Sequence, residues 1–325
     1  MTVPAAPRLG RWRAAAAALV IGCQGGAGAK GGAGEGGSPD SGGDGGEDSG
    51  ADTGPSSYVH SPDAPPEAPA PAAVEAALGQ AVAAFAALEP GLLFGAQDAA
   101  LDQASGSCPG LFPAVGLTTG WSADCSTSTG WGFDGRGQAA WISNVTVDGV
   151  RLDRYGTFIT TTTFTHPGGA TLVLDGRGEY AVARAGETLS LSAALSGTFG
   201  AAPGDAPWLD LAALDGAPSV SAQWEGGATG ADRWLRLEGG LSGGAAAGDE
   251  GLGLRFDGLE LREEAGVCTA TGTVVALMAD GARVALPLDS APCSACGPAT
   301  DAAGRAVGEL CVDLTPLWQP EEWAW

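Results

Sequence analysis

Seven cysteines are the residues whose types and spacing say most about chemistry in this chain. Six lie beyond residue 100: Cys108, Cys125, Cys268, Cys293, Cys296 and Cys311. In an exported chain, an even number of cysteines is typical of a disulfide framework, although six cysteines allow fifteen pairings. Cys108 and Cys125 are the natural local pair. The other four are expected to form two bridges near the C-terminus, with Cys296–Cys311 a candidate pair.

The Cys293-Ser294-Ala295-Cys296 spacing also occurs in thioredoxin-like redox sites and in half of a zinc ribbon. A redox site of that kind places its first cysteine at a helix N-terminus, but Pro292 precedes this motif and Gly297-Pro298 follows it. A zinc ribbon needs a second CxxC, which the sequence lacks. We therefore expect structural disulfides and no metal site.

Groups for nucleophilic catalysis are scarce. The one histidine of the presumed folded part, His166, precedes Pro167-Gly168-Gly169 at an expected hairpin tip, and no Gly-x-Ser-x-Gly elbow occurs. No glycine-rich phosphate loop joins a strand to a helix. The alternative is a secreted glycosidase-like hydrolase, for which the candidate carboxylates are Asp210, Asp215, Glu225, Glu260, Glu263 and Glu264. We expect no catalytic residue and no cofactor.

Tryptophan is the enriched candidate for ligand binding, with ten residues in the chain. Exposed indoles on a β-sheet can stack on sugar rings, whereas buried ones fill a core that has few other aromatic side chains. Core filling is favoured, since Trp131 and Trp141 fall within alternating strand patterns. The weak ligand-binding candidates are Trp121, Trp131, Trp141, Trp224 and Trp234.

The formal net charge of the chain is −23. Such a surface repels phosphate backbones and anionic lipid headgroups, so we expect neither a nucleic-acid partner nor peripheral membrane docking.

The cellular compartment of the protein is indicated by the stretch Leu19-Val20-Ile21-Gly22-Cys23. It follows an apolar run that is too short to span a bilayer, because a membrane-spanning helix needs about 20 residues. The stretch resembles the lipobox of bacterial lipoproteins. That resemblance implies a signal peptide at 1–22, lipidation of Cys23 and a membrane anchor. Gln24 behind the cysteine implies the outer membrane or cell surface. Cleavage after Ala27-Gly28-Ala29, which would release a soluble protein, stays open.

Residues 23–73 are expected to be a disordered tether. Pro39–Gly54 consists of tetrapeptides with an aspartate in every fourth position, and Pro62–Pro71 is rich in proline and alanine. Such composition offers almost nothing to bury.

Residues 74–325 are expected to form a disulfide-stabilised β domain. Apolar residues at helical spacing predict an amphipathic helix over 72–89, ended by Pro90-Gly91, and a second, short helical turn is expected at Asp98–Ala104. From Leu111 onward apolar and polar residues alternate with a period of two. The predicted strands are Ala139–Val147, Thr157–Thr165, Ala170–Leu174, Glu179–Ala183, Thr188–Ser196, Gly253–Phe256, Thr269–Leu277 and Arg283–Leu288. Asp-Gly pairs at 148–149, 175–176, 257–258 and 280–281 predict tight hairpins. The fold class is mainly β, with antiparallel, hairpin-rich sheets as a sandwich or an open or partly closed barrel, and an N-terminal amphipathic helix.

Two stretches of this domain resemble each other, Val147–Asp153 and Phe256–Arg262, each some distance behind a tryptophan. This likeness suggests two related halves, 108–200 and 216–315, although shared hairpin chemistry explains it equally well. We predict an envelope lipoprotein whose β domain has a non-catalytic binding or structural role, with a glycan or a protein as its partner.

Overall fold

The computed structural model describes residues 69–204, 214–249 and 251–318. These residues belong to one compact unit, Glu67–Trp325. The predicted signal peptide, Cys23 and residues 23–68 of the predicted tether lie outside the described residues.

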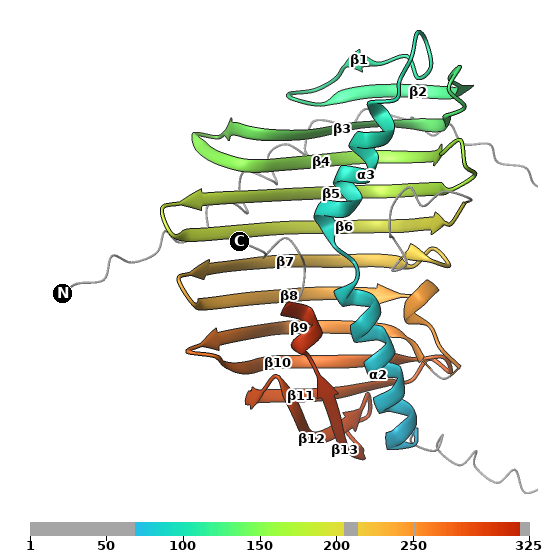
Figure 1. The fold of residues 1–325 in the computed structure, drawn as a ribbon. Coiled ribbons are helices and arrows are strands. Elements are labelled where there is room, and N and C mark those ends of the chain that lie inside the picture. The colour runs from blue at the N-terminus through green and yellow to red at the C-terminus, as the bar shows by residue number, and fades with distance from the viewer. Residues whose placement is uncertain (1–68, 205–213, 250, 319–325) are drawn as a thin grey trace, which may run out of the picture. The chain divides into compact units, whose positions relative to one another are not determined.

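The described chain is mainly β, as predicted, and its thirteen strands form a single antiparallel sheet (Figure 1). Neighbours in the sheet are also neighbours in the chain, from β1 to β13 without a crossover. The strands therefore form one long meander rather than the two facing sheets of a sandwich. Their bounds are β1 Phe112–Pro113, β2 Thr119–Ser126, β3 Gly132–Val147, β4 Val150–Thr165, β5 Thr171–Ala185, β6 Thr188–Ala202, β7 Ser219–Thr229, β8 Asp232–Ser242, β9 Gly251–Glu264, β10 Val267–Met278, β11 Arg283–Pro292, β12 Ser294–Asp301 and β13 Ala306–Asp313.

The Asp-Gly pairs have two different roles. Asp148-Gly149 and Asp280-Gly281 lie between strands, as the hairpin prediction requires. The hairpins predicted at 175–176 and 257–258 are wrong, because both pairs lie inside long strands, β5 and β9. Gly176 lies opposite Gly197, where an added Cβ would meet the Ser196 carbonyl, so this glycine permits close strand approach rather than a turn. The two stretches compared as a duplication thus occupy a hairpin turn in one case and the middle of a strand in the other.

Two helices cover one face of the sheet, which we call the core face. Helix α2 (Pro71–Ala86) packs mainly on β9, β13 and β10, while α3 (Pro90–Leu101) packs on β3, β4 and β6. Both begin with proline, which suits the first helical position because its missing N–H has no helical partner there. The helix predicted over 72–89 therefore ends three residues early, and a second full helix follows in place of a short turn.

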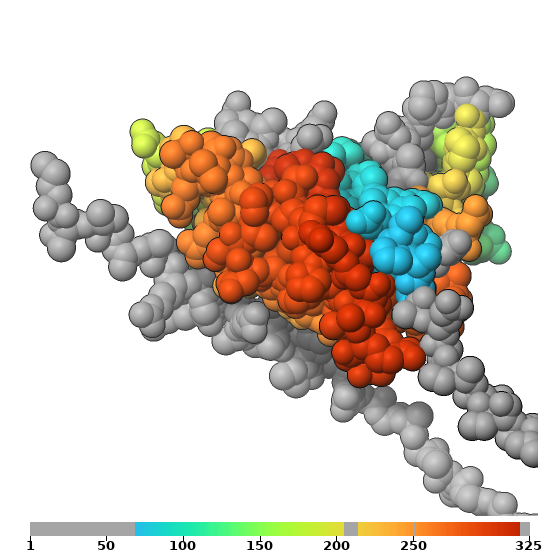
Figure 2. Space-filling model, turned by 90° about the horizontal axis from the view of Figure 1, so that it is seen from below, coloured from blue at the N-terminus to red at the C-terminus, as the bar shows by residue number. Residues whose placement is uncertain are grey.

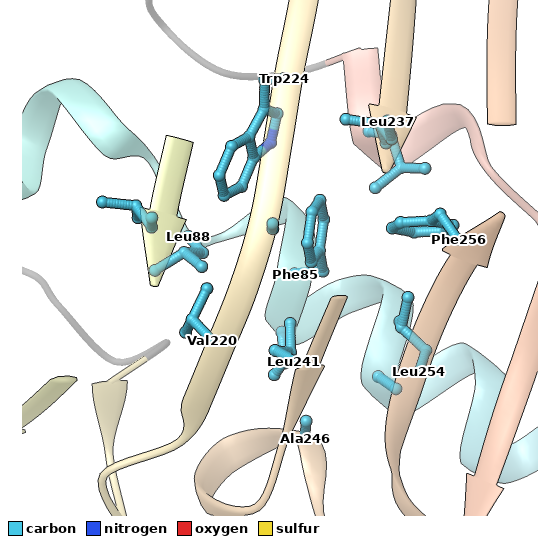
Figure 3. Close-up of a cluster of buried hydrophobic side chains, with 14 of the residues drawn as sticks. Phe85, Leu88, Val220, Trp224, Leu237, Leu241, Ala246, Leu254 and Phe256 are labelled. Atoms are coloured by element: carbon cyan, nitrogen blue, oxygen red, sulfur yellow. The ribbon is translucent and has the colours of Figure 1, made fainter. Parts of the chain in front are cut away.

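The core lies between these helices and the sheet. Phe85 of α2 stacks on Trp224, with ring centroids 5.2 Å apart, and meets Phe256 edge-on at 4.9 Å (Figure 3). Phe94 of α3 stacks on Trp141 at 5.6 Å and contacts Phe158 at 5.0 Å. Alternate residues of each strand supply the remaining side chains, as the period of two requires.

Helix α2 also protects the last strand of the sheet. The Cys311 backbone N–H of β13 donates a 2.7 Å hydrogen bond to a Glu75 carboxylate oxygen, and Gly308 faces Pro71. Figure 2, seen from the β13 end, shows α2 beside the C-terminal strands. The chain therefore enters the folded unit next to β13.

No single helix among the described residues is long and apolar enough to cross a membrane. The pair α2 and α3, bent by 46°, meets the length and composition requirement together.

Candidate functional site

All six downstream cysteines are paired in disulfides. The bridges are Cys108–Cys125, Cys268–Cys293 and Cys296–Cys311, which confirms the disulfide prediction, including the two pairs expected from spacing. Cys293 and Cys296 therefore have different partners, so CxxC is not a redox pair here. Within the described ranges, no three histidine, cysteine or acidic side chains are grouped as metal ligands.

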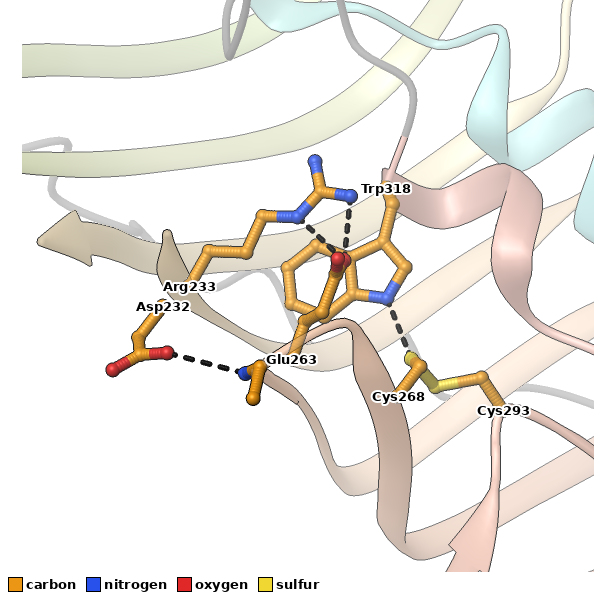
Figure 4. Close-up of polar contacts among 7 residues, drawn as sticks. Asp232, Arg233, Glu263, Cys268, Cys293 and Trp318 are labelled. Atoms are coloured by element: carbon orange, nitrogen blue, oxygen red, sulfur yellow. Dashed lines mark hydrogen bonds and ion pairs between the residues drawn. A yellow bond between two sulfur atoms is a disulfide. The ribbon is translucent and has the colours of Figure 1, made fainter. Parts of the chain in front are cut away.

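The Cys268–Cys293 bridge belongs to a packed structural cluster (Figure 4). Trp318 follows β13 in a 3₁₀ turn, η4 (Thr315–Trp318), and its indole N–H points at the Cys268 sulfur, 2.8 Å away. The Arg233 guanidinium lies 4.8 Å from the Trp318 ring centroid and pairs with Glu263 at 2.6 Å. The cluster connects β8, β9 and β10 to the segment that follows β13, and each side chain named here already has a partner within it.

The candidate tryptophans lie mostly in the core. Trp121, Trp131 and Trp224 are buried, and Trp141 is half-buried against α3. Trp234 is half-buried on the opposite face, which we call the outer face, where its indole covers Gly227. The structure therefore gathers no flat platform from these five side chains.

The candidate carboxylates are also scattered. Glu260 pairs with Arg236 and Arg262, and Glu263 pairs with Arg233. Burial alone would raise the pKa of Glu260, but hydrogen bonds from Arg236 and Arg262 lower it overall, which is opposite to what a general acid requires. Asp215 and Glu264 are exposed, Glu225 is half-buried, and Asp210 lies outside the described residues.

A ladder of polar side chains crosses the outer face from β2 to β6. Ser122, Arg136, Thr161, Asp175 and Thr198 are successive cross-strand partners from β2 to β6, and all five are exposed. Thr161 donates a 2.9 Å hydrogen bond to Asp175. Since side chains two apart on a strand share a face, Asp134 lies beside Arg136 in the same surface.

Ser122, Asp134, Arg136 and Thr161 from this surface line an open pocket of about 330 Å³. Its lining is Ser122, Ala123, Asp134, Gly135, Arg136 and Thr161. Within the described residues, neither the Asp134 carboxylate nor the Arg136 guanidinium has an ion pair or a side-chain hydrogen bond, so both are available to a ligand. Gly135 has a φ of +107° and lies so close to the Thr161 carbonyl that no side chain could be accommodated.

A buried polar network lies beneath the floor of the pocket, on the core face. The Trp121 indole donates to Thr162 at 3.1 Å, and Thr160 donates to Thr162 at 2.7 Å. Both threonine hydroxyls also lie within hydrogen-bond distance of the Arg136 carbonyl. This network fixes the β3 backbone that carries Asp134 and Arg136.

An aromatic ring lies on the same face of β2, outside the pocket lining. The Phe112 ring covers Gly120 so closely that a Cβ added at Gly120 would lie 2.5 Å from it. Phe112 itself is 50% exposed. Gly120 is two residues before Ser122 on the same face of β2, a separation of about 7 Å along a strand. The site therefore combines hydroxyls, one carboxylate, one guanidinium and a nearby exposed ring.

Sequence reasoning missed Phe112, Ser122, Asp134, Arg136 and Thr161. Their signal is weak, because the sequence pattern does not predict β2 as a strand and only its pairing with β3 brings Ser122 beside Arg136. The Asp-x-Arg alternation at 134–136 was the available clue, since two charged residues at a spacing of two face the same side of a strand.

Comparison of the chain with protein-family models, with curated proteins and with solved structures gives no match.

Proposed function

We propose that this chain is a lipid-anchored envelope protein whose β domain binds a neutral glycan, without catalysis, in the outer-face pocket. The observation that carries the proposal is the pair of adjacent, unengaged charged groups of Asp134 and Arg136 in a pocket with two hydroxyls. The pocket volume of about 330 Å³ is at the lower end of the range of small-ligand pockets, which begins near 300 Å³.

The balance of charge favours an uncharged ligand. Arg136 offers several N–H donors in a planar fork, and Asp134 offers acceptor oxygens, so together they can satisfy the donor and acceptor sides of neighbouring hydroxyls. An anionic ligand would meet Asp134 and a chain of net charge −23. A cationic ligand would meet Arg136.

A binding role without catalysis accords with the carboxylates at the site. Glycoside hydrolysis commonly uses two carboxyl groups that flank the scissile bond. Among the described residues, Asp134 is the one acidic residue that lines the pocket, and the neighbouring Asp175 already accepts a hydrogen bond from Thr161.

The three disulfides are consistent with an extracytoplasmic location, where oxidised cysteine pairs persist. In this proposal, Cys23 carries the lipid, and the residues between Cys23 and Pro71 connect the anchor to the sheet. Outer-membrane or cell-surface anchoring accords with the lipobox resemblance.

The glycan proposal is tested by screening the domain on an array of neutral oligosaccharides and then titrating the best binder by calorimetry. Arg136→Ala and Asp134→Asn are each expected to weaken binding by about tenfold or more, since a hydrogen bond to a charged group contributes about 1.5–3 kcal/mol. Arg177→Ala, on the same face but outside the pocket lining, is the matched control and is expected to bind as the parent does. An array without binders, or equal affinity in all three variants, would refute the glycan site.

The anchor is tested separately by metabolic labelling with a fatty-acid probe. We expect label on the parent chain and none on Cys23→Ser. Label that survives the substitution contradicts lipidation at Cys23 and leaves the glycan site untouched.

A further inference from the structure

An exposed apolar cluster lies at the opposite end of the sheet from the point where the chain enters. Leu111, Phe112, Val115 and Leu117 are 45%, 50%, 69% and 52% exposed. They account for four of the nine large hydrophobic residues that are exposed in the described parts of the chain. We call the segment Leu111–Leu117, which contains β1 and the loop after it, the β1 tip (Figure 1). Clusters of this kind usually mark an interaction surface.

The β1 tip is uncharged although the chain is strongly acidic. From Gln103 to Ala123 the sequence contains no acidic, basic or histidine residue, whereas the net charge of the chain is −23. Transfer of this segment into an apolar environment would therefore bury no ionised group, which is the most costly contribution to such a transfer.

The backbone of the tip is partly satisfied within the tip itself. The Ala114 N–H donates to the Thr118 carbonyl at 3.0 Å, and the Thr118 N–H and hydroxyl both donate to the Val115 carbonyl, at 3.3 and 2.8 Å. Pro109 and Pro113 have no N–H to offer to an added strand. These features disfavour partners that extend the sheet edge and favour contact through the apolar side chains.

We propose that the β1 tip inserts into the interfacial region of a lipid bilayer and gives the protein a second membrane contact. A second copy of the chain fits less well. A stable dimer buries about 800 Å² on each partner, far more than four half-exposed side chains offer, and two acidic chains repel each other. A bilayer needs only a small apolar insertion, and one weak membrane contact becomes effective when combined with another.

The proposal rests on the proposed lipid anchor only for the proximity of a membrane. The tip lies twelve strand spacings from β13, where the chain enters, and at about 4.8 Å per spacing this is at most roughly 58 Å. The chain between Cys23 and Pro71 can extend well beyond 100 Å, at about 3.4 Å per residue, so anchor and tip can reach the same bilayer.

The test is vesicle flotation of the mature chain with Cys23→Ser, which lacks the signal peptide and carries no lipid. We expect it to float with neutral phosphatidylcholine vesicles and to float less with anionic ones, because the net charge opposes the latter. The double variant Val115→Asp/Leu117→Asp is expected to stay at the bottom of the gradient. Phe112 is left unchanged because its ring covers Gly120, on the same face of β2 as Ser122.

Val267→Asp is the matched control, since Val267 is 65% exposed on the β9–β10 hairpin and resembles Val115 in exposure. We expect it to float like the parent, and circular dichroism verifies that each variant is folded. Absence of flotation in the parent, or equal flotation in the double variant, overturns the proposal. A lipid-free dimer that the same double substitution abolishes would overturn it in favour of self-association. None of these results depends on glycan binding or on labelling of Cys23.

Discussion

Two glutamates of the sheet have pKa values that differ from the usual value in opposite directions. Partial burial raises the pKa of Glu179 in β5, although Arg177 acts against this effect. Glu260 in β9 is also partly buried, but hydrogen bonds and charge from Arg236 and Arg262 lower its pKa. At this scale, the surroundings of one carboxylate decide whether its ionisation stabilises or destabilises the fold.

These shifts predict opposite pH effects on the free energy of unfolding. The ionised Glu260 stabilises the fold above its unfolded pKa, near 4.5, and this contribution disappears as the pH falls through the lower folded value. The ionised Glu179 destabilises the fold at neutral pH, and that cost declines as the pH falls from its raised folded pKa to the unfolded value, near 4.5. In urea titrations at pH 7, Glu260→Gln is expected to be less stable than the parent and Glu179→Gln more stable.

Each variant is expected to approach the parent in stability as the pH falls below the folded pKa of the carboxyl group, where that group is protonated in both states. A constant difference between pH 7 and pH 3 would show that packing, rather than ionisation, causes the effect.

At the scale of elements, alternation predicted the long strands well. Thr157–Thr165 lies within β4 and Arg283–Leu288 lies within β11. The pattern failed where glycine interrupts it, so the strands predicted at 170–174 and 179–183 are in fact one strand, β5. Strand β8 was missed because its apolar side chains are followed by paired glycines, one of which, Gly239, adopts a φ of +81° at a register shift. Glycine marks breaks and close approaches alike, and sequence alone does not separate the two.

Helix α3 depends on one glycine of the strand beneath it. A Cβ at Gly156 would lie 2.7 Å from both the Phe94 ring and the Trp141 ring. Gly156→Val is therefore expected to push α3 off the sheet and to lower the unfolding free energy by about 1–3 kcal/mol, as overpacking usually does. Chemical denaturation measures the change.

Gly95→Ala is the control, because this α3 glycine has no atom within 4 Å of an added Cβ. It is expected to raise stability by about 0.5–1 kcal/mol through helix propensity. If Gly156→Val were as stable as the parent, α3 could not be packed against β4 as described.

At the scale of the whole molecule, the sequence predicted the class of fold and the disulfides but not the single sheet. Periodicity reports which side chains share a face and does not report how many sheets the strands form. The candidate site was missed for a related reason. Tryptophan is enriched in the chain and is therefore the candidate ligand-binding residue type, yet Trp121 lies in the core. The pocket depends instead on Arg136, which lies beside the other lining residues only because the strands pair. Cys23 remains a prediction, since it lies outside the described residues.

The meander has a consequence for how the domain folds and varies. Every described strand pairs only with strands adjacent in the chain, so each pairing closes a short loop and can form early. A sheet of this kind is not required to reach a fixed number of strands, because no pairing joins its ends in the described residues. Gain or loss of one internal hairpin would leave the other pairings intact. Chains of this architecture could therefore differ in length by whole hairpins, with the β1 tip and the entry point moving apart or together.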